Sequence, residues 1–139
     1  MLHAGNLEKT VRQLIESQIE VSIFVDPDLE QIRQCQKIRA PKIEINTGKF
    51  TEAWIRGSWS SELEKVNTAA KAARKMGLIV LAGHGLNYRN IDAIAVNEDI
   101  EELNIGHSIV ARAALVGLEA AVREMIALMR NPRRLPTQK

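Results

Sequence analysis

The sequence has few of the residues on which several common classes of protein depend. Cys35 is the single cysteine among 139 residues, so a disulfide within these residues is excluded and a reducing compartment is predicted. No apolar run approaches the roughly 18 residues that a membrane-spanning helix needs. The first residues also lack the basic and apolar regions of a signal peptide. We therefore predict a cytoplasmic protein without a membrane partner.

Excess charge of one sign is also missing. The chain has 19 basic and 17 acidic residues, which leaves a net charge of +2 and argues against a nucleic-acid partner. Basic residues gather near the end of the chain, and we interpret residues 131–139 as a frayed, solvated basic tail. The sequence contains neither a metal-ligand constellation nor a GxGxxG motif or P-loop, so no metal site is predicted.

The apolar residues that are present suit one domain over residues 1–139. They make up 45% of the chain, enough for a core. Strands are predicted at 21–25, 42–46, 78–82 and 102–105, and helices at 6–17, 29–39, 61–76, 90–96 and 108–130. This alternation predicts an α/β fold with four parallel strands in sequence order. A closed (β/α)₈ barrel needs eight strands, so the sheet is either small and open or half of a barrel.

The connections carry local signals. Asp26-Pro27-Asp28 is interpreted as a helix-capping sequence rather than a ligand site, and Ser61 is predicted to cap the next long helix. Residues 47–60 are predicted to form a loop. Trp54 and Trp59 in that loop would then serve as a lid over a site or as a patch for a partner.

Glu44 is unusual within a predicted strand. Ile43 and Ile45 share one face of that strand, so Glu44 must point to the other. If helices cover the apolar face, Glu44 faces the interior of the sheet or barrel, where a carboxylate needs a partner or a task. The alternative is an edge strand with one solvated face.

Two strands end in Gly-His, and helix-like sequence follows each. His84 lies between Gly83 and Gly85, where an imidazole can move protons near neutral pH or serve only as a turn residue. Gly106 and His107 precede the C-terminal helix. The free amides at the start of that helix would bind a phosphate; the alternative is that Gly106 and His107 form an ordinary helix start. Since both units follow parallel strands, we predict that they meet at one edge of the sheet.

These motifs closely resemble the C-terminal half of the pyridoxine 5′-phosphate synthase family, which closes the pyridine ring in vitamin B6 biosynthesis. The resemblance extends from about residue 4 to 130. It is carried by Val21-Ser-Ile-Phe-Val-Asp-Pro-Asp28, Ile43-Glu-Ile-Asn-Thr-Gly48, Ala82-Gly-His-Gly-Leu86, Glu102-Leu-Asn-Ile-Gly-His107 and Val116-Gly-Leu-Glu-Ala-Ala-Val-Arg-Glu-Met125.

The resemblance implies a (β/α)₈ (TIM) barrel and a transferase-type enzyme that needs no organic cofactor. The reaction would condense 3-amino-2-oxopropyl phosphate with 1-deoxy-D-xylulose 5-phosphate, giving pyridoxine 5′-phosphate, phosphate and water. His84 matches the family's proton donor and Gly85 a substrate-binding backbone position. Gly106 and His107 match the phosphate site for the amino-ketone, and Glu44 matches a carboxylate that stabilises charged intermediates.

The chain departs from the family in two respects. Asn46 stands where the family usually has histidine, and an amide cannot titrate. The resemblance also reaches only the last four βα units, so we expect the isolated chain to lack full activity. The alternative is a non-catalytic phosphate-binding half-barrel that acts as an assembly module. Two unpaired sheet edges and an apolar inner face would then favour a homo-oligomer or pairing with a second half-barrel.

Overall fold

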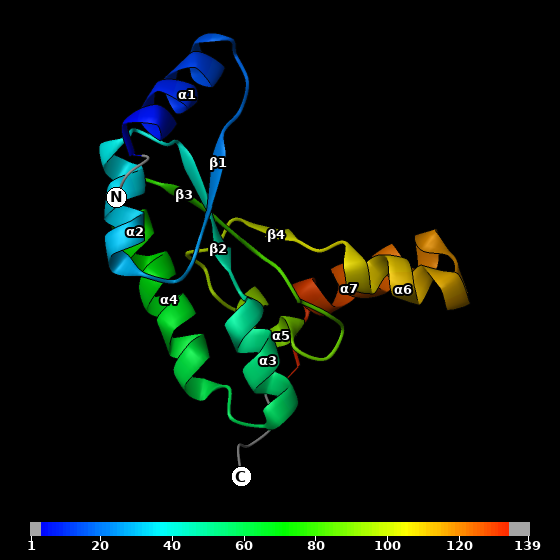
Figure 1. Cartoon of the computed structure of the whole chain (residues 1–139). Helices are drawn as coiled ribbons and strands as arrows, with labels where there is room; N and C mark the ends of the chain where they lie inside the picture. Colours follow the sequence, from blue (N-terminus) through cyan, green and yellow to red (C-terminus); the bar gives the residue numbers. More distant parts are fainter. Residues whose placement is uncertain (1–3, 134–139) are drawn as a thin grey trace.

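The computed structural model describes residues 4–133 and contains one four-stranded parallel sheet (Figure 1). The strands are β1 (Ser22–Val25), β2 (Lys42–Asn46), β3 (Ile79–Gly83) and β4 (Glu102–Asn104). They lie in the order β1-β2-β3-β4, and each pairs in parallel with the next. The predicted α/β fold is confirmed, and it is consistent with half of a (β/α)₈ barrel.

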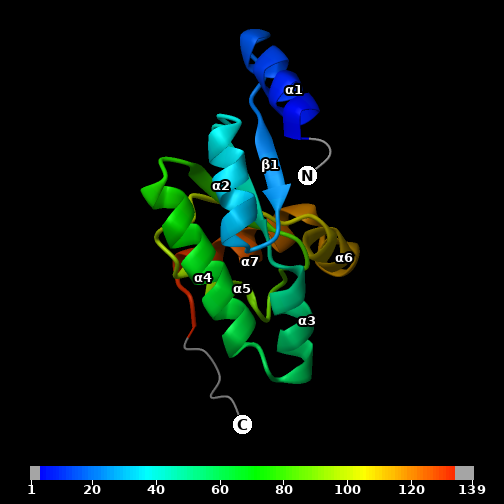
Figure 2. The ribbon, with the colours of Figure 1, turned by 60° about the vertical axis from the view of Figure 1, so that its left-hand side comes forward.

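Seven helices connect or flank these strands within the described residues. They are α1 (Ala4–Glu16), α2 (Leu29–Lys37), α3 (Gly48–Arg56), α4 (Ser60–Lys75), α5 (Ile91–Ala95), α6 (His107–Val116) and α7 (Leu118–Arg130). Helices α2 and α4 lie side by side over one face of the sheet (Figure 2). The α6–α7 hairpin projects beyond β4 (Figure 1). None of the helices in residues 4–133 is long and apolar enough to cross a membrane.

The core lies between the sheet and the helices that cover it. Ile43, Ile45, Val80 and Ala82 point to this side and are 0% exposed, as the alternation of β2 predicts. Cys35 lies on the buried side of α2 and is a core residue. Burial raises the pKa of its thiol, because a thiolate loses hydration there. The cysteine is therefore an inert packing residue.

The uncovered face of the sheet is mainly polar, and the prediction of an apolar inner face was wrong. In register across the four strands lie Phe24, Glu44, Leu81 and Glu102. Of these, Phe24 is 53% exposed and Leu81 is buried. Lys42, Asn46 and Asn104 share the face by the same alternation. The strand residues of this face are therefore suited to bind polar groups.

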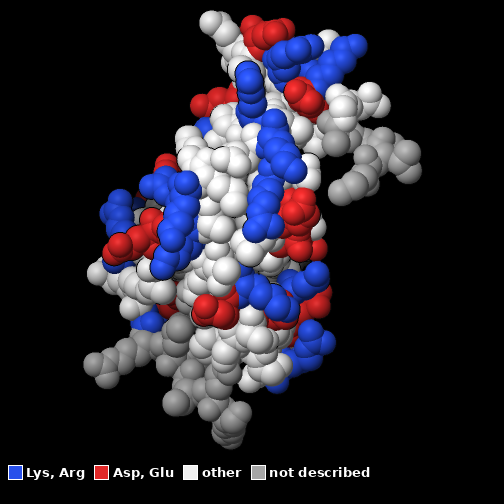
Figure 3. Space-filling model, turned by 90° about the vertical axis from the view of Figure 1, so that its left-hand side faces the viewer, with Lys and Arg blue, Asp and Glu red and all other residues white. Residues whose placement is uncertain are grey.

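Opposite charges are interspersed on the outer side, where α2 and α4 meet solvent. Figure 3 shows basic and acidic side chains next to one another over this side of the molecule. Ion pairs within helices account for part of the pattern, since Arg33 contacts Glu30 and Lys65 contacts Glu62. Exposed pairs of this kind contribute little to stability, so this side serves mainly as a solvated surface.

Residues 47–60 do not form the predicted loop. Helix α3 occupies most of the segment and ends at Gly57, whose φ of 76° is a left-handed C-cap. Phe50 and Ala53 of α3 are buried, a helical spacing that the loop interpretation overlooked. The rings of Trp54 and Trp59 lie 4.8 Å apart, and the Phe50 ring packs edge-on against both. The tryptophans therefore extend the core, and neither is a loop lid.

The predicted boundaries of two later helices also change. Helix α4 begins at Ser60 and has Trp59 at its N-cap, so Ser61 is not the cap. The predicted helix 108–130 is broken at Gly117, whose φ of 84° and ψ of 153° suit only glycine. The break folds α6 back on α7 and leaves Val110 67% exposed.

Candidate active site

A pocket of about 430 Å³ opens at the carboxyl ends of β3 and β4. Two segments form it: residues 84–87 follow β3, and residues 104–108 run from the end of β4 into the first turn of α6. His84, Gly85, Gly106 and His107 all line this pocket. The structure therefore brings together the two Gly-His units at one edge of the sheet, where the sequence predicts them.

His84 has an unusual backbone conformation. Its φ is 82°, which a residue with a side chain rarely adopts. The buried Thr47 stabilises this turn, since its hydroxyl lies 2.7 Å from the carbonyl oxygens of both Gly83 and His84. The Thr47 amide also donates to the Gly83 carbonyl at 2.8 Å. Strain of this kind is typical of functional positions.

The His84 imidazole is exposed and lies between two neighbouring units. On one side the Phe24 ring packs edge-on, with the ring centroids 6.3 Å apart. On the other side lies Gly48, where an added Cβ would be 2.9 Å from His84 Cδ2. Glycine at position 48 therefore leaves room for the imidazole, and the ring stays open to the pocket and to solvent.

Glu44 reaches across β3 toward β4 on the uncovered face. Its Oε2 accepts a hydrogen bond of 2.8 Å from Asn104 Nδ2, and its Oε1 occupies the space above Gly83. A Cβ at Gly83 would be 2.3 Å from that oxygen. Of the two sequence interpretations, the structure supports a carboxylate on the open inner face. Asn104, which sequence analysis missed, links Glu44 to the pocket; its only signal was its place at the end of the last strand.

The amino terminus of α6 faces the pocket. Gly106 occupies the N-cap position of α6, where no side chain hydrogen-bonds to the free amides. A Cβ at Gly106 would meet nothing within 4 Å. The Val110 amide donates to the Gly106 carbonyl, whereas the amides of the first turn have no partner within a helix. Ser108 does not cap the helix, because its hydroxyl donates to the Leu86 carbonyl at 2.8 Å. Open space in front of free amides and the positive helix end is the arrangement that binds anions.

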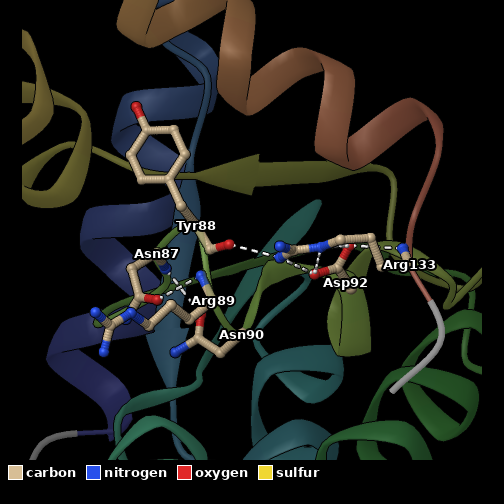
Figure 4. Close-up of polar contacts among 6 residues, drawn as sticks. All are labelled: Asn87, Tyr88, Arg89, Asn90, Asp92 and Arg133. Carbon is tan, nitrogen blue, oxygen red and sulfur yellow. Dashed lines mark hydrogen bonds and ion pairs between the residues drawn. The ribbon is translucent and has the colours of Figure 1, made fainter. Parts of the chain in front are cut away.

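The loop after His84 is held by hydrogen bonds within it (Figure 4) and by a contact with the C-terminal helix α7. Within the loop, the Asn87 amide donates to Asn90 Oδ1 at 2.8 Å, and the Arg89 amide donates to Asn87 Oδ1 at 2.9 Å. From outside, the Tyr88 hydroxyl donates to the Ala121 carbonyl of α7 at 2.8 Å. The wall of the pocket is thus fixed to α7.

Arg133 adds a second brace, so the prediction of a frayed tail over residues 131–139 was wrong at this position. Its Nη2 donates to the Tyr88 carbonyl at 2.6 Å, and its backbone and side chain both donate to Asp92 of α5 (Figure 4). Burial alone would raise the pKa of Asp92, but the hydrogen bonds and charge of Arg133 outweigh it and lower that pKa. Residues 134–139 of the predicted tail lie outside the described residues.

The donor set favours acid–base and anion-binding chemistry. In the described range 4–133, no three or more His, Cys, Asp or Glu side chains are grouped to hold a metal ion. The pocket instead combines an imidazole, a helix amino terminus and, through Asn104, a carboxylate. These groups suit a phosphorylated small molecule that undergoes proton transfer.

The fold is of the α/β class and consistent with half of a βα-barrel, and the pocket lies at the carboxyl ends of β3 and β4. Residues 1–131 match the family described as pyridoxal phosphate biosynthesis protein PdxJ, and the chain belongs to this family. It is 48% identical over 134 residues to the pyridoxine 5′-phosphate synthase of Synechococcus sp. (strain WH7803), covering 94% of this chain and 53% of that protein.

Other relatives with the same name are equally similar. The protein of Prochlorococcus marinus (strain MIT 9303) is 50% identical over 133 residues, which cover 95% of this chain and 54% of the relative. That of Syntrophotalea carbinolica is 50% identical over 119 residues, which cover 86% and 50%. The chain thus spans about half the length of the curated relatives it matches, and the resemblance seen in its motifs is confirmed.

Proposed function

We propose that this chain contributes half of the active site of a pyridoxine 5′-phosphate synthase. The reaction is the ring-closing condensation of 3-amino-2-oxopropyl phosphate with 1-deoxy-D-xylulose 5-phosphate to pyridoxine 5′-phosphate, phosphate and water. The observation that carries the proposal is the meeting of His84 and the α6 amino terminus in one pocket, in a chain of this family. The condensation needs proton transfers and phosphate binding, and both kinds of group are there.

Each residue has a role that its surroundings support. His84, exposed at the pocket, is the proton donor. Glu44 stabilises positive charge that develops on intermediates over the open face. Gly106 and His107 bind the phosphate of the amino-ketone through backbone amides and the imidazole. These roles require no organic cofactor, and we place the protein in the cytoplasm with small phosphorylated substrates as its ligands.

Gly85 has a structural requirement beside its substrate-binding role. Its φ is 77°, and a Cβ there would lie 2.3 Å from the Thr51 hydroxyl oxygen. A side chain at position 85 would therefore both strain the loop and displace Thr51 of α3. Glycine lets the loop backbone pass close to α3, and we assign substrate binding to its backbone.

The phosphate site can be tested on this chain alone. Gly106→Val should reduce the affinity for inorganic phosphate, measured by calorimetry, by an order of magnitude or more. The position is open, so the side chain should block the anion and leave the fold intact. Gly5→Val in α1 is the matched control, because a Cβ at Gly5 also meets nothing within 4 Å. Equal phosphate affinity in Gly106→Val and the parent would reject the assignment.

The reaction itself is tested by supplying the other half of the barrel as a separate chain or by fusion. The isolated chain should show little turnover, whereas the completed barrel should form pyridoxine 5′-phosphate from the two substrates. A correctly folded, phosphate-binding barrel that forms no product would contradict the proposed activity.

That outcome would favour the second candidate, a phosphate-binding half-barrel that acts as an assembly module. Strands β1 and β4 are the two edges of the sheet, and unpaired edges favour association. Next to β4, the hairpin carries exposed Val110, Leu115 and Leu118. We accordingly expect a homo-oligomer or pairing with a second half-barrel, and light scattering that shows a stable monomer would contradict this expectation.

A further inference from the structure

Asp26 has a contact that helix capping does not explain. In the Asp-Pro-Asp sequence, the cap is Asp28, whose Oδ1 accepts from the amides of Glu30 and Gln31. The Asp26 carboxylate instead accepts a 3.0 Å hydrogen bond from Asn46 Nδ2 and lies 3.3 Å from Lys49 Nζ. The preference for capping is therefore correct for Asp28 only. Asp26 joins the carboxyl end of β1 to that of β2.

Asn46 uses both ends of its amide. Its Nδ2 donates to Asp26, and its Oδ1 accepts from the Gly48 amide at 2.9 Å. An ionised carboxylate can only accept and a backbone amide can only donate, so these partners permit one orientation of the Asn46 side chain. Asn46 thereby links Asp26 to the first residue of α3.

The other end of this link lies against His84. The Gly48 backbone leaves just enough room for the imidazole, and Thr47, between Asn46 and Gly48, contacts the His84 carbonyl. The turn at residues 46–48 therefore contacts both the ring and the strained backbone of His84. A shift of this turn would move the imidazole relative to the pocket.

We infer that Asp26 is a positioning residue: through Asn46 it holds the turn at residues 46–48 and so orients His84. Its expected effect on turnover rests on the proposed function of His84. Its effect on the turn and on the imidazole is a property of this chain and can be measured without catalysis.

A reciprocal exchange of the two side chains tests this inference. Asn46→Asp would face Asp26 with a second carboxylate at the 3.0 Å contact, and two like charges cannot share that distance without moving apart or taking up a proton. In the double variant Asp26→Asn/Asn46→Asp, the donor and acceptor exchange places. Residue 46 keeps an oxygen for the Gly48 amide, so the link is restored.

Two measurements on the full chain report the result. Hydrogen exchange of the Gly48 amide should become about tenfold faster in Asn46→Asp, because repulsion from Asp26 would displace residue 46 and open the turn more often. It should return to within about twofold of the parent in the double variant. The NMR signals of the His84 ring should shift and recover in the same order. Asp26→Ala removes the acceptor without adding charge. It should change the Gly48 exchange rate and the His84 ring signals in the same direction as Asn46→Asp does.

Asn97→Asp is the matched control. Asn97 also donates its side-chain amide to another side chain, Asn67, but lies between α5 and β4, before rather than after a strand. It should leave the Gly48 and His84 signals unchanged. A double variant that is as perturbed as Asn46→Asp, or single variants that match the parent, would overturn the inference.

Turnover in the completed barrel separates this inference from the proposed function. We expect kcat to fall about tenfold in Asn46→Asp and to recover in the double variant, with KM changed less. If the parent barrel has no turnover, the proposed function fails, and the exchange and NMR results still decide the positioning. If the parent is active and kcat does not follow the Gly48 and His84 signals, Asp26 has no positioning role in catalysis.

Discussion

Arg133→Ala should lower the free energy of unfolding, although Arg133 lies near the end of the chain, where most substitutions have little effect. Asp92 is 3% exposed, and its carboxylate receives hydrogen bonds from the Arg133 amide, Nε and Nη2. Alanine keeps the amide but removes the guanidinium. The variant therefore leaves a buried carboxylate with one of its partners and no compensating charge, and it also frees the Tyr88 carbonyl.

The magnitude follows from the burial of the two partners. Breaking a fully buried ion pair by removing one partner costs about 3–5 kcal/mol. The Arg133 side chain is 56% exposed, so solvent screens this pair, and a loss of about 1–3 kcal/mol is the better expectation. Asp92→Asn should cost less, because an amide oxygen still accepts from Arg133 and no charge is left buried.

Urea unfolding followed by circular dichroism measures this loss, with Arg130→Ala as the control for an exposed arginine at the end of α7. The difference in the free energy of unfolding between the parent and Arg133→Ala should depend on pH. Because the folded pKa of Asp92 is lowered, the parent has this stabilisation above the unfolded pKa of about 3.9 and loses it as the pH falls through the folded value. The difference between parent and Arg133→Ala should thus shrink below about pH 4. Equal stability of Arg133→Ala and Arg130→Ala at pH 7 would refute the reasoning.

Three further predictions concern the pocket and the hairpin. Gly83→Ala should destabilise the sheet by about 1–3 kcal/mol, since its Cβ would displace the Glu44 carboxylate and lie 3.0 Å from the Asn104 carbonyl oxygen of β4; urea unfolding measures the loss. In the completed barrel, His84→Asn should lower kcat by about 10²–10⁴, whereas His107→Asn should mainly raise the KM for the amino-ketone phosphate. Steady-state kinetics distinguishes the two effects. A His84→Asn variant with the parental kcat would show that His84 is only a turn residue. Gly117→Ala should cost more than about 1 kcal/mol, because its φ of 84° and ψ of 153° are closed to alanine; an unchanged melting temperature would contradict this.

Several misplaced boundaries share one physical cause. Helix α3 was missed because Gly48 and Gly57 were both taken as loop residues, although Phe50 and Ala53 between them have helical spacing. Gly117 lies inside the predicted helix 108–130, yet it adopts a conformation that ends a helix. A glycine allows both outcomes at similar local cost. Packing between elements selects one of them: Phe50 of α3 joins the buried core, and α6 folds back on α7 at Gly117.

Alternation of apolar residues was sufficient to determine the order of the strands, the parallel sheet and the buried face of β2, because burial of apolar surface follows periodicity directly. The Gly-His motifs likewise determined which strand ends carry the pocket. Only the tertiary structure decided how those motifs are held. Asp26 meets Asn46, Asn104 meets Glu44, and Arg133 reaches Asp92 across 41 residues of chain. Such polar contacts depend on distance and orientation between separate elements, and periodicity within one element contains no record of them.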